Sequence, residues 1–147
     1  MPQGHRERFD IMFVAETPSM SGTESNFCNT ARDTFLQTIM EKYGVAGCYV
    51  TDIVKERAKP GMPTEVKIRR WRPFLIEEIE IIAPKAIVVL GRRTYEHSFK
   101  PFIEPCINKN ILVEYVFHYC SQVRRAKFEE RFADVMERIR SSIQDRP

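Results

Sequence analysis

The sequence predicts an α/β fold, a three-layer α/β/α sandwich in which helices cover both faces of a short four-stranded parallel sheet. Four short runs rich in β-branched and aromatic residues are typical of buried strands, and segments with apolar residues at helical spacing alternate with them. This alternation favours parallel strands joined by crossover helices. Because 147 residues suit one hydrophobic core, we expect a single domain over residues 1–147.

The first strand is expected at Ile11–Ala15 and the second at Cys48–Thr51. A polar loop over residues 17–26 follows the first strand. A helix is expected at roughly residues 30–43, where apolar residues recur on one face, before two glycines lead into the second strand.

Thr64 is expected to cap the next helix, in which Pro73 indicates a break or a restart, and residues 83–84 end it. The almost wholly apolar run at residues 86–91 is typical of a central parallel strand. Residues 99–109 contain two prolines and are expected to be irregular. The fourth strand is expected at residues 111–117, and apolar residues then recur at helical spacing through the C-terminal segment. These are Phe128, Phe132, Val135, Met136, Ile139 and Ile143.

The amino-acid composition excludes several classes of protein. The chain is 43% hydrophobic and 29% charged, with no apolar stretch near the length of a membrane span and a polar, basic start that does not resemble a signal peptide. We therefore expect a cytoplasmic protein, monomeric and without a membrane partner. A net charge of +3 is a mild indication of a polyanionic partner, although scattered solvated charge is equally compatible with it. The four cysteines show no CxxC pairing and are expected to be free thiols. They are Cys28, Cys48, Cys106 and Cys120.

Three of the predicted strands end abruptly in a polar residue: Glu16, Asp52 and His118. The carboxyl ends of parallel strands meet at one edge of a sheet, where ligands bind, so these three side chains should lie close together. Taken singly, each has a structural explanation. Glu16 could cap the following turn, Asp52 could pair with Lys55 or Arg57, and a lone histidine is most often a satisfied, partly buried residue.

The order of the motifs adds information that single residues lack. A Glu-x-Pro sequence follows the first strand, an aromatic residue precedes the first helix, a strand ends in Asp-Ile-Val-Lys, and Pro-Lys-Ala-Ile-Val-Val-Leu-Gly and His-x-x-Ser follow. This order resembles the uracil-DNA glycosylase superfamily, most closely its family 4 branch, over roughly residues 10–132. The resemblance implies a monofunctional DNA glycosylase that flips out a deaminated base, with uracil as the leading candidate, and hydrolyses its N-glycosidic bond in base excision repair. It implies DNA as the partner, and no metal or organic cofactor is required for this chemistry.

The resemblance also assigns roles to residues. Phe27 would stack on the extruded base, and His118 would stabilise the negative charge that grows on the departing base. Glu16 would border the pocket near the attacking water or the C5 edge of the base, and Asp52 would face the hydrogen-bonding edge. Ala15 and Pro18 complete the base-binding set, and the DNA-binding set is Lys55, Tyr119, Ser121, Arg124 and Arg125.

Three departures from the family pattern matter. Family 4 members carry four cysteines for an iron-sulfur cluster, but here no cysteine precedes the first strand, and Glu56 and Trp71 stand where later ligands would be expected, so we predict no cluster. The His-Pro-Ser motif becomes His-Tyr-Cys-Ser, which is one residue longer. Finally, Asp52 replaces the asparagine that offers uracil both a donor and an acceptor, whereas an ionised carboxylate only accepts.

Three explanations of Asp52 stay open: it is protonated in its pocket, the preferred base presents more donors, or the residue is structural. The first two keep the chain a glycosylase, of uracil or of a donor-rich base such as hypoxanthine. The altered positions also fit a non-catalytic relative that binds DNA or a nucleotide. A flavodoxin-like domain with an unrelated ligand is a weaker alternative, because a fold does not determine a function.

Overall fold

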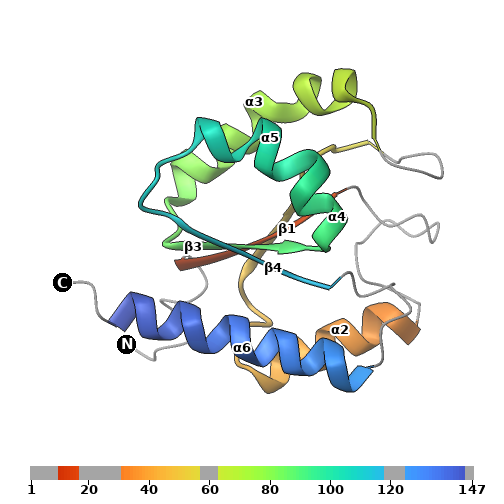
Figure 1. Ribbon diagram of the computed structural model, residues 1–147, viewed down its shortest axis with the longest axis vertical. Coiled ribbons are helices and arrows are strands. Elements are labelled where there is room, and N and C mark those ends of the chain that lie inside the picture. Colours follow the sequence, from red (N-terminus) through yellow and green to blue (C-terminus); the bar gives the residue numbers. More distant parts are fainter. Residues whose placement is uncertain (1–9, 17–30, 57–62, 118–124, 145–147) are drawn as a thin grey trace.

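Four parallel strands form one sheet in the order β2-β1-β3-β4 in a computed structural model of the chain (Figure 1). The structure describes residues 10–16, 31–56, 63–117 and 125–144. The strands are β1 (Ile11–Ala15), β2 (Tyr49–Asp52), β3 (Ala86–Leu90) and β4 (Leu112–Val116). The prediction of a short four-stranded parallel sheet is confirmed. The fourth strand was expected slightly longer, at residues 111–117, and the second was expected one residue earlier, so Cys48 lies just before β2 and Asp52 ends it.

The strand β1 lies inside the sheet and is buried along its whole length. It pairs with β2 on one side, where Ala15 is opposite Asp52, and with β3 on the other, where Val14 is opposite Val89. Because all pairs are parallel, the carboxyl ends of β1, β2 and β3 lie at one edge, here called the carboxyl edge.

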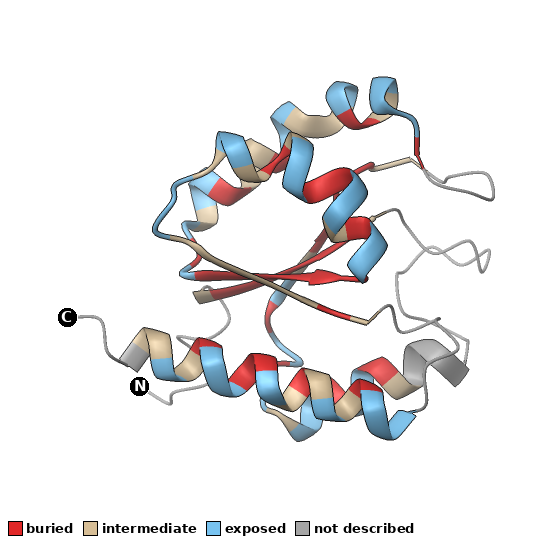
Figure 2. Cartoon of the chain, in the orientation of Figure 1, coloured by how far each residue is buried: buried red, intermediate tan, exposed pale blue. Residues whose placement is uncertain are grey.

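Helices cover both faces of the sheet, as the sequence predicts (Figure 1). The helices α2 (Ala31–Lys42) and α6 (Arg125–Gln144) cover one face, and α3 (Glu65–Ile82) and a helical segment over residues 92–106 cover the other. Side chains alternate along a strand, so Phe13 of β1 packs with the first pair of helices and Met12 and Val14 pack with α3. Figure 2 shows the buried residues of α6 on its sheet-facing side.

The break expected at Pro73 is absent, and that prediction is wrong. The helix α3 runs through Pro73 from the N-cap Thr64, whose hydroxyl accepts from the Lys67 amide at 3.3 Å, to the left-handed C-cap Ala83. Pro73 lies on the exposed side of the helix. A proline inside a helix costs about 3 kcal/mol, and burial of Leu75 and neighbouring apolar residues on the opposite side offsets that cost.

The irregular segment expected at residues 99–109 is helical in its first part, which corrects that prediction. After α4 (Arg92–Thr94) the chain forms the π-helix η1 (Tyr95–Phe99), α5 (Lys100–Phe102) and the 3₁₀ turn η2 (Glu104–Cys106). Each proline stands in the first turn of its short helix, where the missing amide is tolerated.

The helices expected at residues 30–43 and in the C-terminal segment are confirmed as α2 and α6. Cys48 and Cys106, the two cysteines in the described part of the chain, form no disulfide, as expected. Within that same part, no helix combines the length and the apolar character that a membrane span requires.

Candidate active site at the carboxyl edge

Five of the residues predicted from the sequence to form the site lie in the described part of the chain. They are Ala15, Glu16, Asp52, Lys55 and Arg125. The other predicted residues lie outside the described residues, and they are Pro18, Phe27, His118, Tyr119, Ser121 and Arg124.

Glu16 and Asp52 both lie at the carboxyl edge, at the ends of the adjacent strands β1 and β2. Ala15 is opposite Asp52 in the β1–β2 pair, and the ladder continues beyond both strands. The Ile53 amide donates to the Ala15 carbonyl and the Val54 amide donates to the Glu16 carbonyl, each at 2.9 Å. The backbone of Glu16 is therefore held by β2, and Asp52, at 8% exposed, is buried beside it.

The Glu16 side chain lies half-buried and contacts the segment that follows β3. The Thr94 hydroxyl donates to its carboxylate, with 3.4 Å between Thr94 Oγ1 and Glu16 Oε2. Burial raises the pKa of Glu16, while the charge of His97, the Thr94 hydrogen bond and the charge of Arg93 partly oppose that rise. A carboxylate with a raised pKa at such an edge is suited to accept a proton from water.

Thr94, His97 and Arg93 are site residues that the sequence analysis did not find. They come from the turn and helix that begin at Gly91, whose φ of 119° favours glycine. His97 Nε2 lies 3.2 Å from the Pro63 carbonyl oxygen. Because a carbonyl oxygen only accepts, this nitrogen carries the hydrogen. Their position in the sequence could have identified them, because these polar residues follow the third strand at the same edge of the sheet as Glu16.

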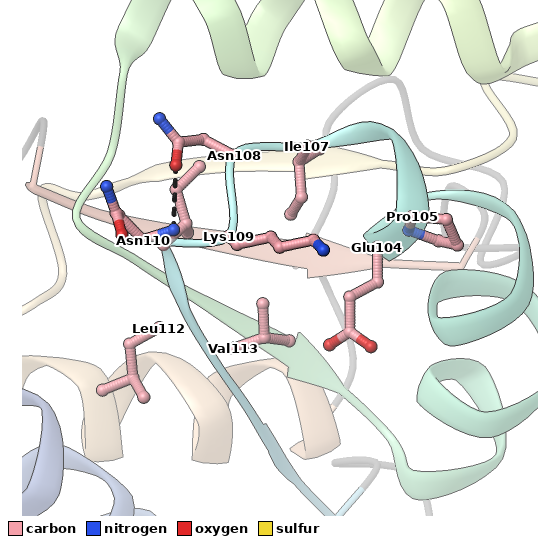
Figure 3. Close-up of a pocket in the computed structure, with 9 residues that line it drawn as sticks. Glu104, Pro105, Ile107, Asn108, Lys109, Asn110, Leu112 and Val113 are labelled. Carbon is pink, nitrogen blue, oxygen red and sulfur yellow. Dashed lines mark hydrogen bonds between the residues drawn. The ribbon is translucent and has the colours of Figure 1, made fainter.

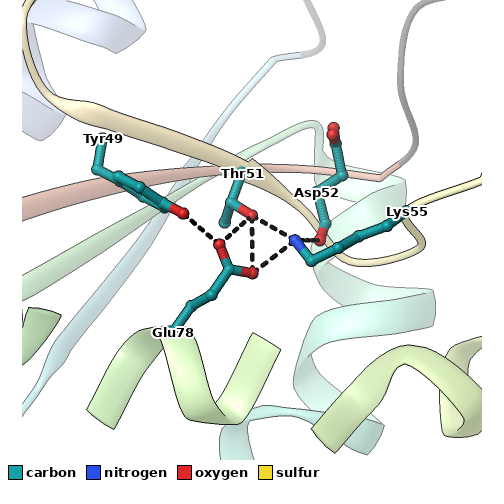
Figure 4. A network of polar contacts seen from close by, with 5 residues as sticks. All are labelled: Tyr49, Thr51, Asp52, Lys55 and Glu78. Carbon is teal, nitrogen blue, oxygen red and sulfur yellow. Dashed lines mark hydrogen bonds and ion pairs between the residues drawn. The ribbon is translucent and has the colours of Figure 1, made fainter. Parts of the chain in front are cut away.

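A polar network lies on the α3 side of β2 (Figure 4). The Lys55 ammonium lies 2.5 Å from Glu78 Oε1 and donates to the Thr51 hydroxyl at 2.7 Å. Tyr49 and Thr51 also donate to the Glu78 carboxylate. The bond from Lys55 to Asp52 goes to the backbone carbonyl oxygen, at 3.3 Å, and Figure 4 shows the Asp52 carboxylate directed away from the network.

The electrostatics of this network indicate a structural role. Burial raises the pKa of Glu78, but hydrogen bonds from Lys55, Tyr49 and Thr51 outweigh burial, so the net shift is downward. The hydrogen bond to Glu78 raises the pKa of Tyr49 to about 12. The structure thus places the Lys55 ammonium in an internal ion pair, and its contact with DNA stays a prediction.

Arg125 begins α6 and is exposed. Its guanidinium carbon lies 4.9 Å from the centroid of the Phe35 ring, a cation–π contact that fixes the side chain over α2. One face of the guanidinium is therefore used within the protein. Its predicted DNA contact is untested by this geometry.

The positions that the resemblance gives to cluster ligands do not fit an iron-sulfur cluster, because they offer no thiolate. The Trp71 indole donates to Glu56 Oε2 at 3.2 Å, and Lys67 Nζ lies 3.1 Å from Glu56 Oε1. These contacts lower the pKa of Glu56 and use its carboxylate within the protein. Cys48 and Cys106 precede β2 and β4, at the opposite edge of the sheet. In the described ranges, no three His, Cys, Asp or Glu side chains form a group that could hold a metal ion.

Two cavities lie at the amino edge of the sheet, away from Glu16 and Asp52. One has a volume of about 580 Å³ and is formed by residues 104–113 (Figure 3), and the other, of about 390 Å³, lies between these residues and the end of α3. Since both are remote from the carboxyl ends of the strands, we assign neither to the candidate site.

The chain is similar to known proteins. A family model of the uracil DNA glycosylase superfamily matches residues 1–140. The chain is 34% identical over 95 residues to the type-4 uracil-DNA glycosylase of Sulfurisphaera tokodaii, covering 61% of this chain and 43% of that protein. It is 29% identical over 105 residues to the type-4 uracil-DNA glycosylase of Saccharolobus solfataricus, covering 68% of this chain and 49% of that protein. The chain spans about half the length of these relatives.

Proposed function

Because the chain belongs to the uracil-DNA glycosylase superfamily, we propose that it excises uracil from DNA by hydrolysing the N-glycosidic bond, as the first step of base excision repair. Two of its relatives are named type-4 uracil-DNA glycosylases. We further propose that it acts inside the cell as a monomer and needs no cofactor.

The observation that carries this proposal is the position of Glu16 and Asp52, which both lie at the carboxyl edge on the neighbouring strands β1 and β2. One carboxylate is half-buried with a raised pKa, and the other is buried one strand away. In an open parallel sheet this edge is where a ligand binds. Two acidic side chains at that edge suit a reaction that needs one group to accept a proton from water and a second group to recognise the nucleobase.

The reaction proceeds by loss of the base and addition of water at the sugar. The bond between C1′ and the base nitrogen breaks, and its electron pair leaves with the base. Water forms the new bond to C1′, and Glu16 orients this water and accepts its proton. His118 donates a hydrogen bond to the base oxygen on which the negative charge grows, and Phe27 stacks on the extruded base. The base finally takes up a proton, and an abasic site remains.

The DNA backbone is held by cationic and polar side chains around this edge. Arg125 stands at the start of α6, and Arg93 follows β3 close enough to Glu16 to affect its charge. The segment that contains Tyr119, Ser121 and Arg124 is proposed to enter the groove or hold phosphates beside the extruded nucleotide.

A second candidate function concerns the base. Asp52 is buried at the end of β2, where the family resemblance places the residue that reads the base. An ionised carboxylate there accepts the N3 proton of uracil but opposes the O4 acceptor, a mismatch of about 1–3 kcal/mol. This position therefore favours, as the second candidate, a glycosylase that prefers a base with more donors, such as hypoxanthine.

The experiment is an excision assay with protein in excess over oligonucleotides that contain one uracil, hypoxanthine or xanthine. Each is tested single-stranded and mispaired, and alkali then cleaves any abasic site. We expect strand cleavage at uracil, and none in a control oligonucleotide with thymine or with the variant Glu16→Gln combined with His118→Ala. Cleavage only at hypoxanthine would establish the second candidate. DNA binding without cleavage of any substrate would refute the glycosylase proposal.

A further inference from the structure

We infer that Thr94 is a positioning residue for Glu16, holding its carboxylate at the carboxyl edge in the orientation that the reaction needs. The inference rests on the proposed function for the role of Glu16. It concerns the segment after β3, which the sequence motifs do not assign to the site.

The Thr94 side chain is buried at the point where it contacts Glu16. Thr94 is 5% exposed, and its hydroxyl donates to Glu16 Oε2 at 3.4 Å. Thr94 occupies the N-cap position of η1 but makes no side-chain capping bond there. The hydroxyl is therefore available to the carboxylate of another strand.

The hydrogen bond between Thr94 and Glu16 is a long one. Hydroxyl-to-oxygen hydrogen bonds usually measure about 2.5–3.0 Å, so the contact at 3.4 Å is long. Catalytic hydrogen bonds are often long in the free protein and shorten when the substrate is bound. We expect closure of the Thr94 contact to be part of that shortening.

His97 connects the segment to the start of α3. It lies in the π-helix η1, where the Lys100 amide donates to the Tyr95 carbonyl, and its Nε2 donates to the Pro63 carbonyl. Single π-helical turns within helices are frequent at functional sites. The hydrogen bond to Pro63 fixes the ring in the same segment as Thr94, and His97 contributes to lowering the pKa of Glu16.

The charges around Glu16 have a consistent sense. Arg93 and His97 belong to the segment after β3, and their charges lower the pKa of Glu16. The buried Asp52 lies on the adjacent strand β2. Burial alone would favour the neutral acid. The segment after β3 therefore partly offsets the rise in the pKa of Glu16 that burial causes.

The main test compares Thr94→Val, which removes the hydroxyl at nearly constant volume, with Thr94→Ser, which keeps it. Single-turnover excision should slow about tenfold in Thr94→Val, the loss expected for one hydrogen bond to a charged group, with unchanged affinity for DNA. Thr94→Ser should stay close to the wild type. In a Glu16→Gln background, Thr94→Val should add nothing, whereas a purely structural role would give additive losses.

A second measurement does not depend on activity. NMR titration of the Glu16 carboxyl carbon should show its pKa rising in Thr94→Val and in His97→Gln, and returning toward the wild-type value in Thr94→Ser. Thr51→Val is the matched control, because this buried threonine donates to Glu78 instead. An unchanged Glu16 pKa in Thr94→Val overturns the inference. A raised pKa in a protein that excises no base supports the contact and refutes the proposed function.

Discussion

The Glu78 network allows a quantitative prediction about stability. Glu78→Gln keeps the shape of the side chain and removes its charge, so Lys55 loses the carboxylate 2.5 Å from its ammonium. The amide can still accept from Tyr49 and Thr51 as a neutral group. Glu78→Gln therefore removes only those interactions of the network that depend on the negative charge of Glu78.

The magnitude follows from burial and from the number of donors. The Glu78 side chain is 20% exposed and receives three side-chain donors, and hydrogen bonds to charged groups contribute about 1.5–3 kcal/mol. Lys55 is 29% exposed, so water replaces part of what it loses. We expect a loss of about 2 kcal/mol in the free energy of unfolding, or about 4–8 °C in Tm for a chain of this size.

The pH dependence gives the sign of the effect. The pKa of Glu78 is lowered in the folded protein from its ordinary value of 4.5, so its stabilisation is fully present above that value. It is lost as the pH falls through the lowered folded pKa. The gap in Tm between wild type and Glu78→Gln should therefore be wide at neutral pH and close in acid.

The assay is thermal unfolding followed by circular dichroism from neutral to acid pH. Glu77→Gln is the matched control, since Glu77 is the exposed neighbour of Glu78 on α3 and should change Tm by less than about 1–2 °C. The reasoning is refuted if the two variants have equal Tm at neutral pH, or if the gap for Glu78→Gln persists in acid.

Three further predictions concern the site and its surroundings. Asp52→Asn should raise uracil excision near neutral pH, because asparagine offers a donor and an acceptor; unchanged rate, base preference and pH profile would show that Asp52 does not read the base. His118→Ala should slow single-turnover excision while leaving DNA affinity almost unchanged, as expected for stabilisation of the transition state, and equal loss of both would indicate a structural histidine. Purified protein should be colourless with no stoichiometric iron, and Glu56→Gln should lower Tm more than Glu65→Gln, an exposed α3 carboxylate; a brown preparation would contradict our interpretation of Glu56 and Trp71.

Much of the fold could be predicted from sequence because burial imposes local patterns. The runs at β1 and β3 are apolar throughout, since both faces of a parallel sheet are covered, and α6 shows a clear helical period. The break at Pro73 was predicted wrongly because proline chemistry is local, whereas packing of Leu75 and its neighbours on the sheet is not. The helical segment at residues 95–106 was missed for the same reason.

The site could be predicted only where a motif marks it. Glu16 and Asp52 were found because each ends an apolar run, and the parallel pairing of β1 with β2 brings the ends of both runs to the same edge of the sheet. Thr94 and His97 carry no motif, and their relation to Glu16 depends on a π-helix and on a contact across 78 residues. For Lys55 the sequence predicted a contact with DNA, and it gave no indication of the ion pair that this lysine forms with Glu78 on α3.

The order of the elements along the chain also determines when the sheet can become covered during synthesis. The strand β1 is made early and can pair with β2, but its second partner β3 follows only some seventy residues later. The part of the sheet face that packs against α6 stays exposed until α6 leaves the ribosome, since five core residues of that face lie on this helix. Until the ribosome has passed Gln144, nascent chains therefore expose an apolar sheet face to other molecules. Chaperone dependence and aggregation of truncated chains should follow from this sequence of events.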